Sequence, residues 1–393
     1  MFRTRELSVA AGVTAIASVT LLADHLGFSG STYSVTGAPR AVVAADLDDD
    51  GKADFASADM QSDTVTLYRG QPGPEGRVTF TAWAVLPLPP GAGPFDIKAA
   101  DLNRDGNTDI IVANADNNTV SIFAGADDVP PALQATVSVG GSPRGVVAAD
   151  LNRDGKLDLA VTGANCNCVT LLRNGGGFSF TQAARVTGLS QPHGLAVGDF
   201  NHDDIPDLAV SSTAASAVDV LVGDGNFQFA RRRHGPSPAT RAVVVVDYDR
   251  DGWDDIVTAN STTSDAQPNI SVFRNDNFVF HYMEAAATEV NFLPPGDRRG
   301  IAVLNINGDG WPDLAFSVRN QARVGYASGR GRDGFVATGS SDDTDAVPAS
   351  GGPRGLSIAD VNEDGRQDIV VSNEFDRSVS VLVNISEQVG GVR

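Results

Sequence analysis

The chain has 393 residues, of which 41% are hydrophobic, and this is the composition of a folded globular protein rather than a disordered chain. Its formal net charge of -20 argues against general nucleic-acid binding, because phosphate backbones would be repelled, and makes cations the natural partners. The two cysteines, Cys166 and Cys168, cannot build a disulfide scaffold or a cysteine-based zinc site.

The N-terminal segment has the layout of a signal peptide. Arg3 and Arg5 precede a charge-free stretch from Leu7 to Ala23, and Asp24 ends that stretch. We therefore expect residues 1–23 to be a signal peptide and the protein to be secreted or periplasmic; the alternative is an N-terminal helix or an uncleaved anchor. No other run approaches the roughly 20 apolar residues that a membrane span needs, so none is expected in the mature chain.

One acidic pattern recurs seven times after this segment. The first copy, Ala45 to Asp54, reads Ala-Asp-Leu-Asp-Asp-Asp-Gly-Lys-Ala-Asp, and its first acidic position is Asp46. The equivalent positions of the later copies are Asp101, Asp150, Asp199, Asp247, Asn305 and Asp360. These starts are 48–58 residues apart, so seven units account for the rest of the chain.

Each unit carries the signals of four short strands. In the third unit, an apolar run at 145–151 enters the acidic loop, a β-branched run at 157–162 leaves it, and an alternating segment at 168–172 and a more polar one at 178–186 follow. Four antiparallel strands in a repeat of this length form one propeller blade. The sequence therefore predicts an all-β, seven-bladed β-propeller over residues 31–393.

The two ends of the chain predict how the ring closes. The last unit offers only three strands, at 354–361, 367–372 and 378–384, whereas Ser31 to Gly37 resembles an outer strand that has no blade of its own. Pairing the N-terminal strand with the last unit would remove an exposed sheet edge. The alternative is that both ends remain unpaired.

The acidic loops have the chemistry of calcium sites. Positions 1, 3, 5 and 9 carry Asp or Asn, and position 6 is Gly in every loop but one. Calcium takes six to eight oxygen ligands in a flexible shell, to which position 7 would add a backbone carbonyl. Glycine permits the left-handed conformation that such a turn needs. We expect up to seven Ca²⁺ ions and not Mg²⁺, which holds its waters tightly; the alternative is a set of Asx-rich turns without ions.

These loops resemble the FG-GAP and VCBS repeats of integrin-α-type propellers, whose hairpin loops hold calcium. The acidic half of the repeat is well kept in all seven units, whereas the Phe-Gly half is poorly kept. Carried over position by position, the resemblance implies one set of ligands in each loop. These sets are Asp46, Asp48, Asp50, Lys52 and Asp54; Asp101, Asn103, Asp105, Asn107 and Asp109; Asp150, Asn152, Asp154, Lys156 and Asp158; Asp199, Asn201, Asp203, Ile205 and Asp207; Asp247, Asp249, Asp251, Trp253 and Asp255; Asn305, Asn307, Asp309, Trp311 and Asp313; and Asp360, Asn362, Asp364, Arg366 and Asp368.

The loops differ in charge. The fourth has Asp204 where Gly is expected, which weakens this site without excluding it, because Asp tolerates the left-handed conformation better than most residues. The sixth has two carboxylates and is expected to be the weakest. The predicted ligands include 22 carboxylates, without which the formal net charge of -20 would become +2. The acidity of the protein is therefore the acidity of its loops.

The positions of several residues outside the loops predict roles for them. Five arginines lie six residues before a loop, namely Arg40, Arg144, Arg241, Arg299 and Arg354. They would form a positive ring in the central channel, although we favour pairing of each arginine with an acidic loop neighbour. His193, at the same position of the fourth unit, is interpreted as a strand-entry residue and not as a base.

Three further features remain open at this point. The basic cluster at 231–234 is interpreted as a solvated connection, with a patch for an anionic ligand as the alternative. Cys166 and Cys168 are expected in a strand-to-strand turn. They form either a disulfide or two free thiols. Trp253 and Trp311, at position 7 of their loops, would offer faces for sugar stacking.

Together these features predict a calcium-stabilised extracellular or periplasmic binding module for a protein or a glycan, without catalytic activity. Propellers are scaffolds whose loops decide the ligand. The resemblance extends to mushroom lectins of integrin-like propeller fold, which bind sugars between blades. The alternative is a polysaccharide lyase or hydrolase with a calcium-dependent active cleft, because related calcium propellers include polysaccharide lyases.

Overall fold

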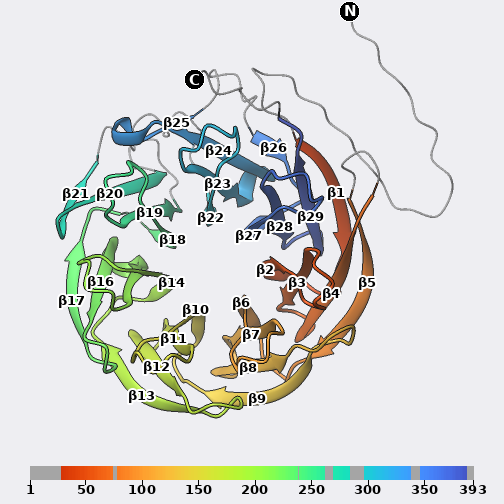
Figure 1. Ribbon diagram of the computed structural model, residues 1–393, viewed down its shortest axis with the longest axis horizontal. Coiled ribbons are helices and arrows are strands. Elements are labelled where there is room, and N and C mark those ends of the chain that lie inside the picture. The colour runs from red at the N-terminus through yellow and green to blue at the C-terminus, as the bar shows by residue number, and fades with distance from the viewer. Residues whose placement is uncertain are drawn as a thin grey trace, which may run out of the picture.

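The computed structural model is a ring of seven β-sheet blades around a central channel (Figure 1). The structure describes residues 28–73, 78–237, 239–261, 269–283, 296–337 and 346–386. No helix in these ranges is long and apolar enough to cross a membrane. The signal peptide expected at residues 1–23 lies outside the described residues.

Each blade is an antiparallel sheet, and in the first six blades the strands run in chain order from the channel outward. The first two blades are β2 (Pro39–Ala45), β3 (Asp54–Asp59), β4 (Thr64–Pro72) and β5 (Val78–Pro87), then β6 (Pro94–Ala100), β7 (Asp109–Asn114), β8 (Thr119–Ala124) and β9 (Ala132–Ser138). The third and fourth are β10 (Pro143–Ala149), β11 (Asp158–Gly163), β12 (Cys168–Asn174) and β13 (Phe180–Thr187), then β14 (Pro192–Gly198), β15 (Asp207–Ser212), β16 (Ala217–Gly223) and β17 (Phe229–His234). The fifth and sixth are β18 (Thr240–Val246), β19 (Asp255–Asn260), β20 (Ile270–Asp276) and β21 (Val279–Tyr282), then β22 (Arg298–Leu304), β23 (Asp313–Val318), β24 (Arg323–Gly329) and β25 (Phe335–Ala337), with β26 (Ala346–Pro348) also pairing with β24. The seventh contains β27 (Pro353–Ala359), β28 (Asp368–Asn373), β29 (Ser378–Asn384) and β1 (Phe28–Ser34). Three short 3₁₀ turns, η2 (Thr213–Ala215), η3 (Arg319–Gln321) and η4 (Gly331–Asp333), complete the described elements.

The N-terminal strand completes the seventh blade. β1 pairs antiparallel with β29, so that Phe28 lies opposite Asn384 and Ser34 opposite Ser378. The pairing ends three residues earlier than the expected segment at 31–37, because the chain must then cross to the first blade. Thr36 already belongs to that blade, since its hydroxyl donates to Asp59 Oδ2 at 2.8 Å. The two ends of the described chain therefore share one sheet, as Figure 1 shows.

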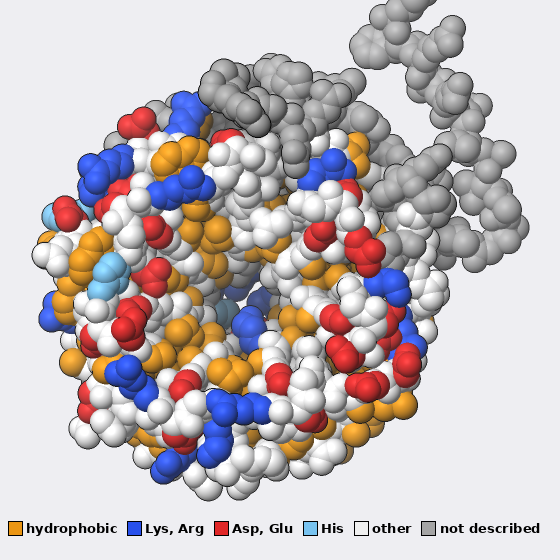
Figure 2. All heavy atoms as spheres, in the orientation of Figure 1, with side chains coloured by type: hydrophobic (Ala, Val, Ile, Leu, Met, Phe, Trp, Pro, Cys, Tyr) orange, Lys and Arg blue, Asp and Glu red, His pale blue; other side chains and the backbone are white. Residues whose placement is uncertain are grey.

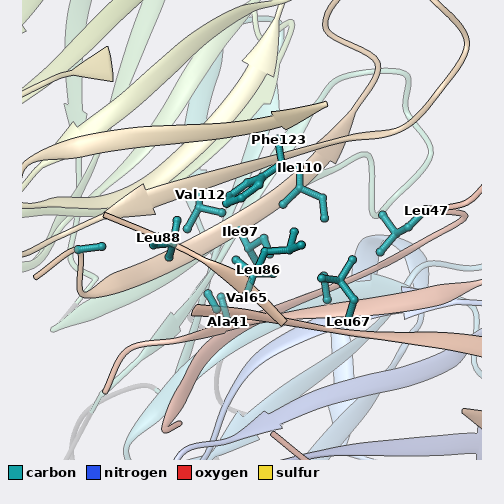
Figure 3. Packing of buried hydrophobic residues seen from close by; sticks show 13 residues of the cluster. Ala41, Leu47, Val65, Leu67, Leu86, Leu88, Ile97, Ile110, Val112 and Phe123 are labelled. Atoms are coloured by element: carbon teal, nitrogen blue, oxygen red, sulfur yellow. The ribbon is translucent and has the colours of Figure 1, made fainter. Parts of the chain in front are cut away.

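The core is divided among the contacts between blades. Seven apolar clusters can be traced in the described residues, each formed by two successive blades. Figure 3 shows the first cluster, in which Val65 and Leu67 of β4 pack with Ile97 of β6 and Phe123 of β8. The second strands are buried along their whole length, as in β7 and β11. Blade-to-blade packing therefore holds the ring together.

Position 2 of every acidic loop contributes to these clusters. Its side chain is apolar and at most 2% exposed, and it packs toward the neighbouring blade. The seven residues are Leu47, Leu102, Leu151, Phe200, Tyr248, Ile306 and Val361. Burying one Leu side chain contributes about 1.5–3 kcal/mol, so each loop is anchored by packing as well as by its polar bonds. No role was predicted for position 2 from the sequence.

Candidate functional site

All seven acidic loops connect a first strand to a second strand and share one backbone conformation. Positions 4 and 6 both have positive φ, for example +60° at Asp49 and +84° at Gly51. Asp204 adopts this conformation with φ +60°, and its N–H donates to Asp199 Oδ2 at 2.9 Å, as the glycine N–H does in other loops. The fourth loop therefore keeps the turn despite lacking glycine.

The position 1 carboxylates hold the turn closed. All seven loops lie in the described residues. In six of them this side chain accepts hydrogen bonds from the backbone N–H groups of positions 5 and 6, as Asp46 does from Asp50 and Gly51 at 3.2 and 2.8 Å. The sixth loop differs, because its Asn305 side chain accepts from Gly308 at 3.0 Å instead. Each carboxylate oxygen has two lone pairs, so these bonds leave acceptor capacity at position 1.

Positions 3 and 5 contact each other. Where position 3 is Asn, its amide Nδ2 donates to the carboxylate at position 5 over 2.7–2.9 Å. The position 5 carboxylate also receives the N–H of position 7 and, in three loops, faces a basic position 7 side chain. Those side chains are Lys52, Lys156 and Arg366. The sequence predicted only a backbone-carbonyl role for these residues. Their positive charges partly neutralise the position 5 carboxylates.

Where position 3 is Asp, an arginine on the third strand of the same blade pairs with it. Asp48 is 4% exposed and lies 2.6 Å from Arg69 Nε on β4, and Asp249 is 6% exposed and lies 2.9 Å from Arg274 Nε on β20. Neither arginine was predicted from the sequence to contact a loop. Arginine stands at the same place in the third strand of both units, but Arg173 also stands there in the third unit, where position 3 is Asn152, so the sequence alone does not identify these pairs.

Position 9 is buried and ties three parts of the blade together. One carboxylate oxygen of Asp109 accepts the Leu102 N–H at 2.8 Å, and the other accepts the Gly125 N–H of the third strand's end at 2.9 Å. The same two bonds recur in all seven loops, at distances of 2.7–3.1 Å. Position 9 therefore has a structural role that its prediction as a metal ligand did not include.

Burial perturbs these position 9 carboxyl groups. Loss of hydration raises the pKa of Asp255 to about 8 and that of Asp54 to about 7, although backbone N–H bonds oppose the shift. The pKa of Asp368 is raised to about 7 and that of Asp313 to about 6 for the same reason. A charged carboxylate at these positions is expensive to bury, and a neighbouring cation would lower that cost.

The structure brings three carboxylates together in two of the loops. Carboxylate oxygens of Asp46, Asp48 and Asp50 lie within 4.8 Å of one another, and so do those of Asp247, Asp249 and Asp255. Asp54 and Asp251 lie outside these two groups, although both belong to the predicted ligand sets. The first and fifth loops are those with four predicted carboxylates, so charge and geometry select the same loops.

The two loop tryptophans pack against the loop before them. The Trp253 ring stacks on the His202 ring, with centroids 3.7 Å apart and planes 3° apart. The Trp311 ring lies under the Arg250 guanidinium, whose Cζ is 4.6 Å from the ring centroid. Position 4 of one loop thus covers position 7 of the next, and one face of each ring is already occupied by protein.

The five arginines that precede the loops line the central cavity and make no ion pair with residues of the acidic loops, so the pairing favoured above is wrong. They sit at the second position of their inner strands, at the opposite end from the acidic loops, and His193 joins them there. Arg40 and Arg354 instead contact Glu374, and Arg299 contacts Asp297. Figure 2 shows basic side chains deep in the central opening.

Two other expectations are settled by the fold. The basic cluster at 231–234 is part of the outer strand β17 and not a connection, and Arg233 in it binds the buried Asp219 carboxylate at 2.9 Å. Cys166, in the turn after β11, and Cys168, the first residue of β12, form a disulfide with their Cα atoms 5.3 Å apart. The described chain contains no free cysteine.

Comparison with protein families places these loops in a known context. The FG-GAP-like repeat family matches residues 46–112, 101–161, 247–316 and 305–371, which together cover more than half of the chain. Each match contains two consecutive acidic loops. The chain belongs to the FG-GAP-like repeat family. No curated protein sequence matches this FG-GAP-like chain.

Solved structures support the propeller fold of this FG-GAP-like protein. Selenomethionine-substituted virginiamycin B lyase from Staphylococcus aureus is 13% identical with a TM-score of 0.57, and the match covers 91% of this chain and 99% of the lyase. BBS1N in complex with ARL6DN is 10% identical with a TM-score of 0.62, and the match covers 96% of this chain and 99% of BBS1N. At such identities the similarity concerns the fold alone.

Proposed function

We propose that this FG-GAP-like propeller is a calcium-stabilised binding module of the extracellular space or periplasm, which recognises a protein or a glycan without catalysing a reaction. An FG-GAP repeat propeller is suited to a binding or structural role.

The fifth loop carries the calcium proposal. Asp249 is almost fully buried, and its Oδ1 receives no hydrogen bond from the described residues. Asp247 and Asp255 each place a carboxylate oxygen within 4.8 Å of a carboxylate oxygen of Asp249. Buried carboxylate oxygens without a donor are costly unless a cation or another donor satisfies them, so this donor set fits a hard cation.

Charge balance supports a divalent ion in this loop. The four predicted ligand carboxylates of this loop, with Arg274 and Arg332 beside Asp249, together carry a charge of -2 when all are ionised, which Ca²⁺ would balance. Asp247, Asp249 and Asp255 would hold the ion, with the Asp251 carboxylate and the Trp253 carbonyl as further candidates. A bound ion would supply electrostatic neutralisation of carboxylates that otherwise repel one another at short range.

Export is supported by two features of the chain. The segment at 1–23 has signal-peptide layout, and the Cys166–Cys168 disulfide suits an oxidising compartment. Cytosolic thiol systems keep most cysteine pairs reduced. Expression with the native N-terminus, followed by fractionation and N-terminal sequencing, tests this part: we expect a secreted or periplasmic chain that begins near Asp24.

Calcium-dependent stability is the direct test of the metal proposal. Thermal unfolding of a chain beginning at Asp24 is compared in chelator, in Ca²⁺ and in Mg²⁺ at matched ionic strength. We expect Ca²⁺ to raise the melting temperature most, because each site at 100-fold excess over its Kd contributes about 2.7 kcal/mol. Asp249→Asn should lose part of this gain, whereas Asp333→Asn, an exposed carboxylate outside the loops, should keep it. Equal melting curves in chelator and Ca²⁺ would contradict the proposal.

The ligand requires a separate assay. Glycan arrays and a screen against extracellular protein extracts are run with Ca²⁺ and with chelator, alongside a polysaccharide-degradation screen. We expect calcium-dependent binding and no depolymerisation. Shortening of a polysaccharide by the protein would instead favour the lyase or hydrolase alternative.

A further inference from the structure

The end of the channel opposite the metal loops is a cavity with an uneven distribution of charge. It has a volume of about 390 Å³, within the lower part of the roughly 300–1,000 Å³ range of small-molecule sites. Five of the seven inner strands contribute an arginine to its wall, and Phe95 and His193 occupy the equivalent positions of the other two. Arg319 makes a sixth arginine, so the cavity is positive in a protein whose net charge is -20.

On one side of the cavity these charges are neutralised within the protein. Glu374 contacts Arg40 at 2.8 Å, Arg319 at 2.8 Å and Arg354 at 3.0 Å. Asp297 contacts Arg299 at 2.6 Å and Arg319 at 3.3 Å. The part of the wall formed by blades six, seven and one is therefore a closed network of ion pairs.

On the other side, blades three to five form an arc without an acidic partner. Arg144 and Arg241 flank His193, and neither arginine makes an ion pair with a described residue. The Nε of Arg241 is buried and has no hydrogen-bond partner there. Asp116 and Asp297 act on the two arginines only at longer range. Ala164 in blade three occupies the position that Glu374 has in blade seven, one residue after the second strand.

The chemistry of the arc fits an anionic ligand. Burial, followed by the surrounding arginines, holds the pKa of His193 well below its usual range, so His193 is neutral and offers a hydrogen bond without adding charge. Arg144 lies over the Phe95 ring, with its Cζ 4.3 Å from the ring centroid. This contact orients the guanidinium through its face, so the N–H groups at its edge remain available to a ligand. Guanidinium groups bind carboxylates and phosphates through paired hydrogen bonds.

We propose that the arc of Arg144, His193 and Arg241 binds a small organic anion with at least two negative charges on carboxylate or phosphate groups. The anionic groups of such a ligand would pair with Arg144 and Arg241 as Glu374 pairs with the equivalent Arg40 and Arg354. The site lies at the other end of the inner strands from the metal loops, so it is separate from the calcium-dependent binding proposed above. The negative net charge of the protein is screened beyond about 8–10 Å at physiological ionic strength and does not oppose binding inside the cavity.

Calorimetric titration of the calcium-loaded protein tests this site. The probes are succinate, which presents two carboxylates, and glycerol phosphate, which presents one phosphate; acetate is the control with a single charge. We expect succinate or glycerol phosphate to bind at least about 10-fold more tightly than acetate, because each can make at least one further charged hydrogen bond to the arginines. The stronger of the two probes identifies the anionic group. Failure of both probes to bind the wild-type protein would overturn the proposal.

Variants locate the binding. The double variant Arg144→Gln and Arg241→Gln should raise the Kd of the probe by about 100-fold or more, because loss of each arginine should raise it by about 10- to 100-fold. Arg231→Gln with Arg232→Gln removes the same charge from the exposed outer strand of blade four and should leave binding unchanged. Ala164→Glu adds the carboxylate that blade seven has, so it should abolish binding and raise the melting temperature. Binding that survives Ala164→Glu, or that is lost only in the outer-strand variant, would refute the assignment.

Discussion

The structure places carboxylates that look alike in the sequence in two different environments, and paired alanine substitutions in the second loop test what this difference does. Asp109, at position 9, is fully buried and accepts two backbone N–H groups. Asp101, at position 1, is partly exposed and accepts N–H groups of a loop that is open to water. This loop has neither an arginine partner nor a basic residue at position 7, so the comparison is free of other ion pairs.

The expected loss at position 9 can be worked out from these contacts. Asp109→Ala leaves the Leu102 and Gly125 N–H groups without an acceptor inside the blade, and each unsatisfied buried group costs about 1–3 kcal/mol. Burial raises the pKa of Asp109, so the charged carboxylate is costly to bury. Removing it eliminates this cost and offsets part of the loss. We expect a net fall in the free energy of unfolding of about 2–4 kcal/mol. At Asp101 water can replace the lost acceptor, so the loss should stay below about 1 kcal/mol.

Urea unfolding in chelator, followed by circular dichroism, measures both variants without a metal contribution. Repeating the measurement in Ca²⁺ should reveal the second role, because Asp101→Ala should then lose the calcium-dependent gain of its loop. Equal losses for the two variants in chelator would refute the structural role of position 9. A large loss for Asp101→Ala in chelator would show that position 1 also holds the fold without metal.

Two further predictions concern ring closure and the ion pairs of the channel. A chain beginning at Pro39 keeps all seven loops but lacks β1, so it should melt at a lower temperature and form more aggregate than one beginning at Asp24; equal melting temperatures and monomer fractions, by calorimetry and gel filtration, would contradict closure by β1. Burial alone would raise the pKa of Glu374, but Arg354, Arg319 and Arg40 outweigh it and hold that pKa below its usual value. The stability that the ionised Glu374 carboxylate contributes is therefore fully present above the unfolded pKa of about 4.3. It is lost as the pH falls through the lower pKa of the folded state. Glu374→Gln should cost about 3–5 kcal/mol at neutral pH, a difference that shrinks toward pH 3 in urea unfolding, and a difference that stays constant with pH would rule out this ion-pair role.

Much of the fold could be predicted because each of its signals is local. The acidic pattern repeats with nearly constant spacing, and each copy is followed by a run that forms a fully buried strand, such as β7 or β28. The missing fourth strand of the last unit also predicted an N-terminal partner, although β1 begins at Phe28 and not at Ser31. Strand boundaries shifted by a few residues because turns and crossovers, and not only alternation, decide where pairing stops.

The roles within the loops were less predictable. The spacing of Asp and Asn identified which side chains lie in each turn, but it did not show that position 9 faces inward toward two backbone N–H groups. It also did not show that Asp48 and Asp249 are paired with Arg69 and Arg274, which lie two strands further along the chain. Side-chain direction depends on how the strands of a blade pack, and a pattern of ten residues does not contain that information.

By itself the sequence determined the number of blades, the chemistry of their loops and the residue that each inner strand places six positions before its loop. Only the tertiary structure decided what those inner residues do. Arg144 and Arg241 are 97 residues apart in the chain, and they meet His193 in one cavity because closure of the ring brings equivalent positions of all blades to a common axis. Which of these arginines is neutralised depends on Glu374 and Asp297, which lie beside the channel in only two of the blades. Contacts across a closed ring depend on its geometry, and the repeat pattern of a single blade cannot specify them.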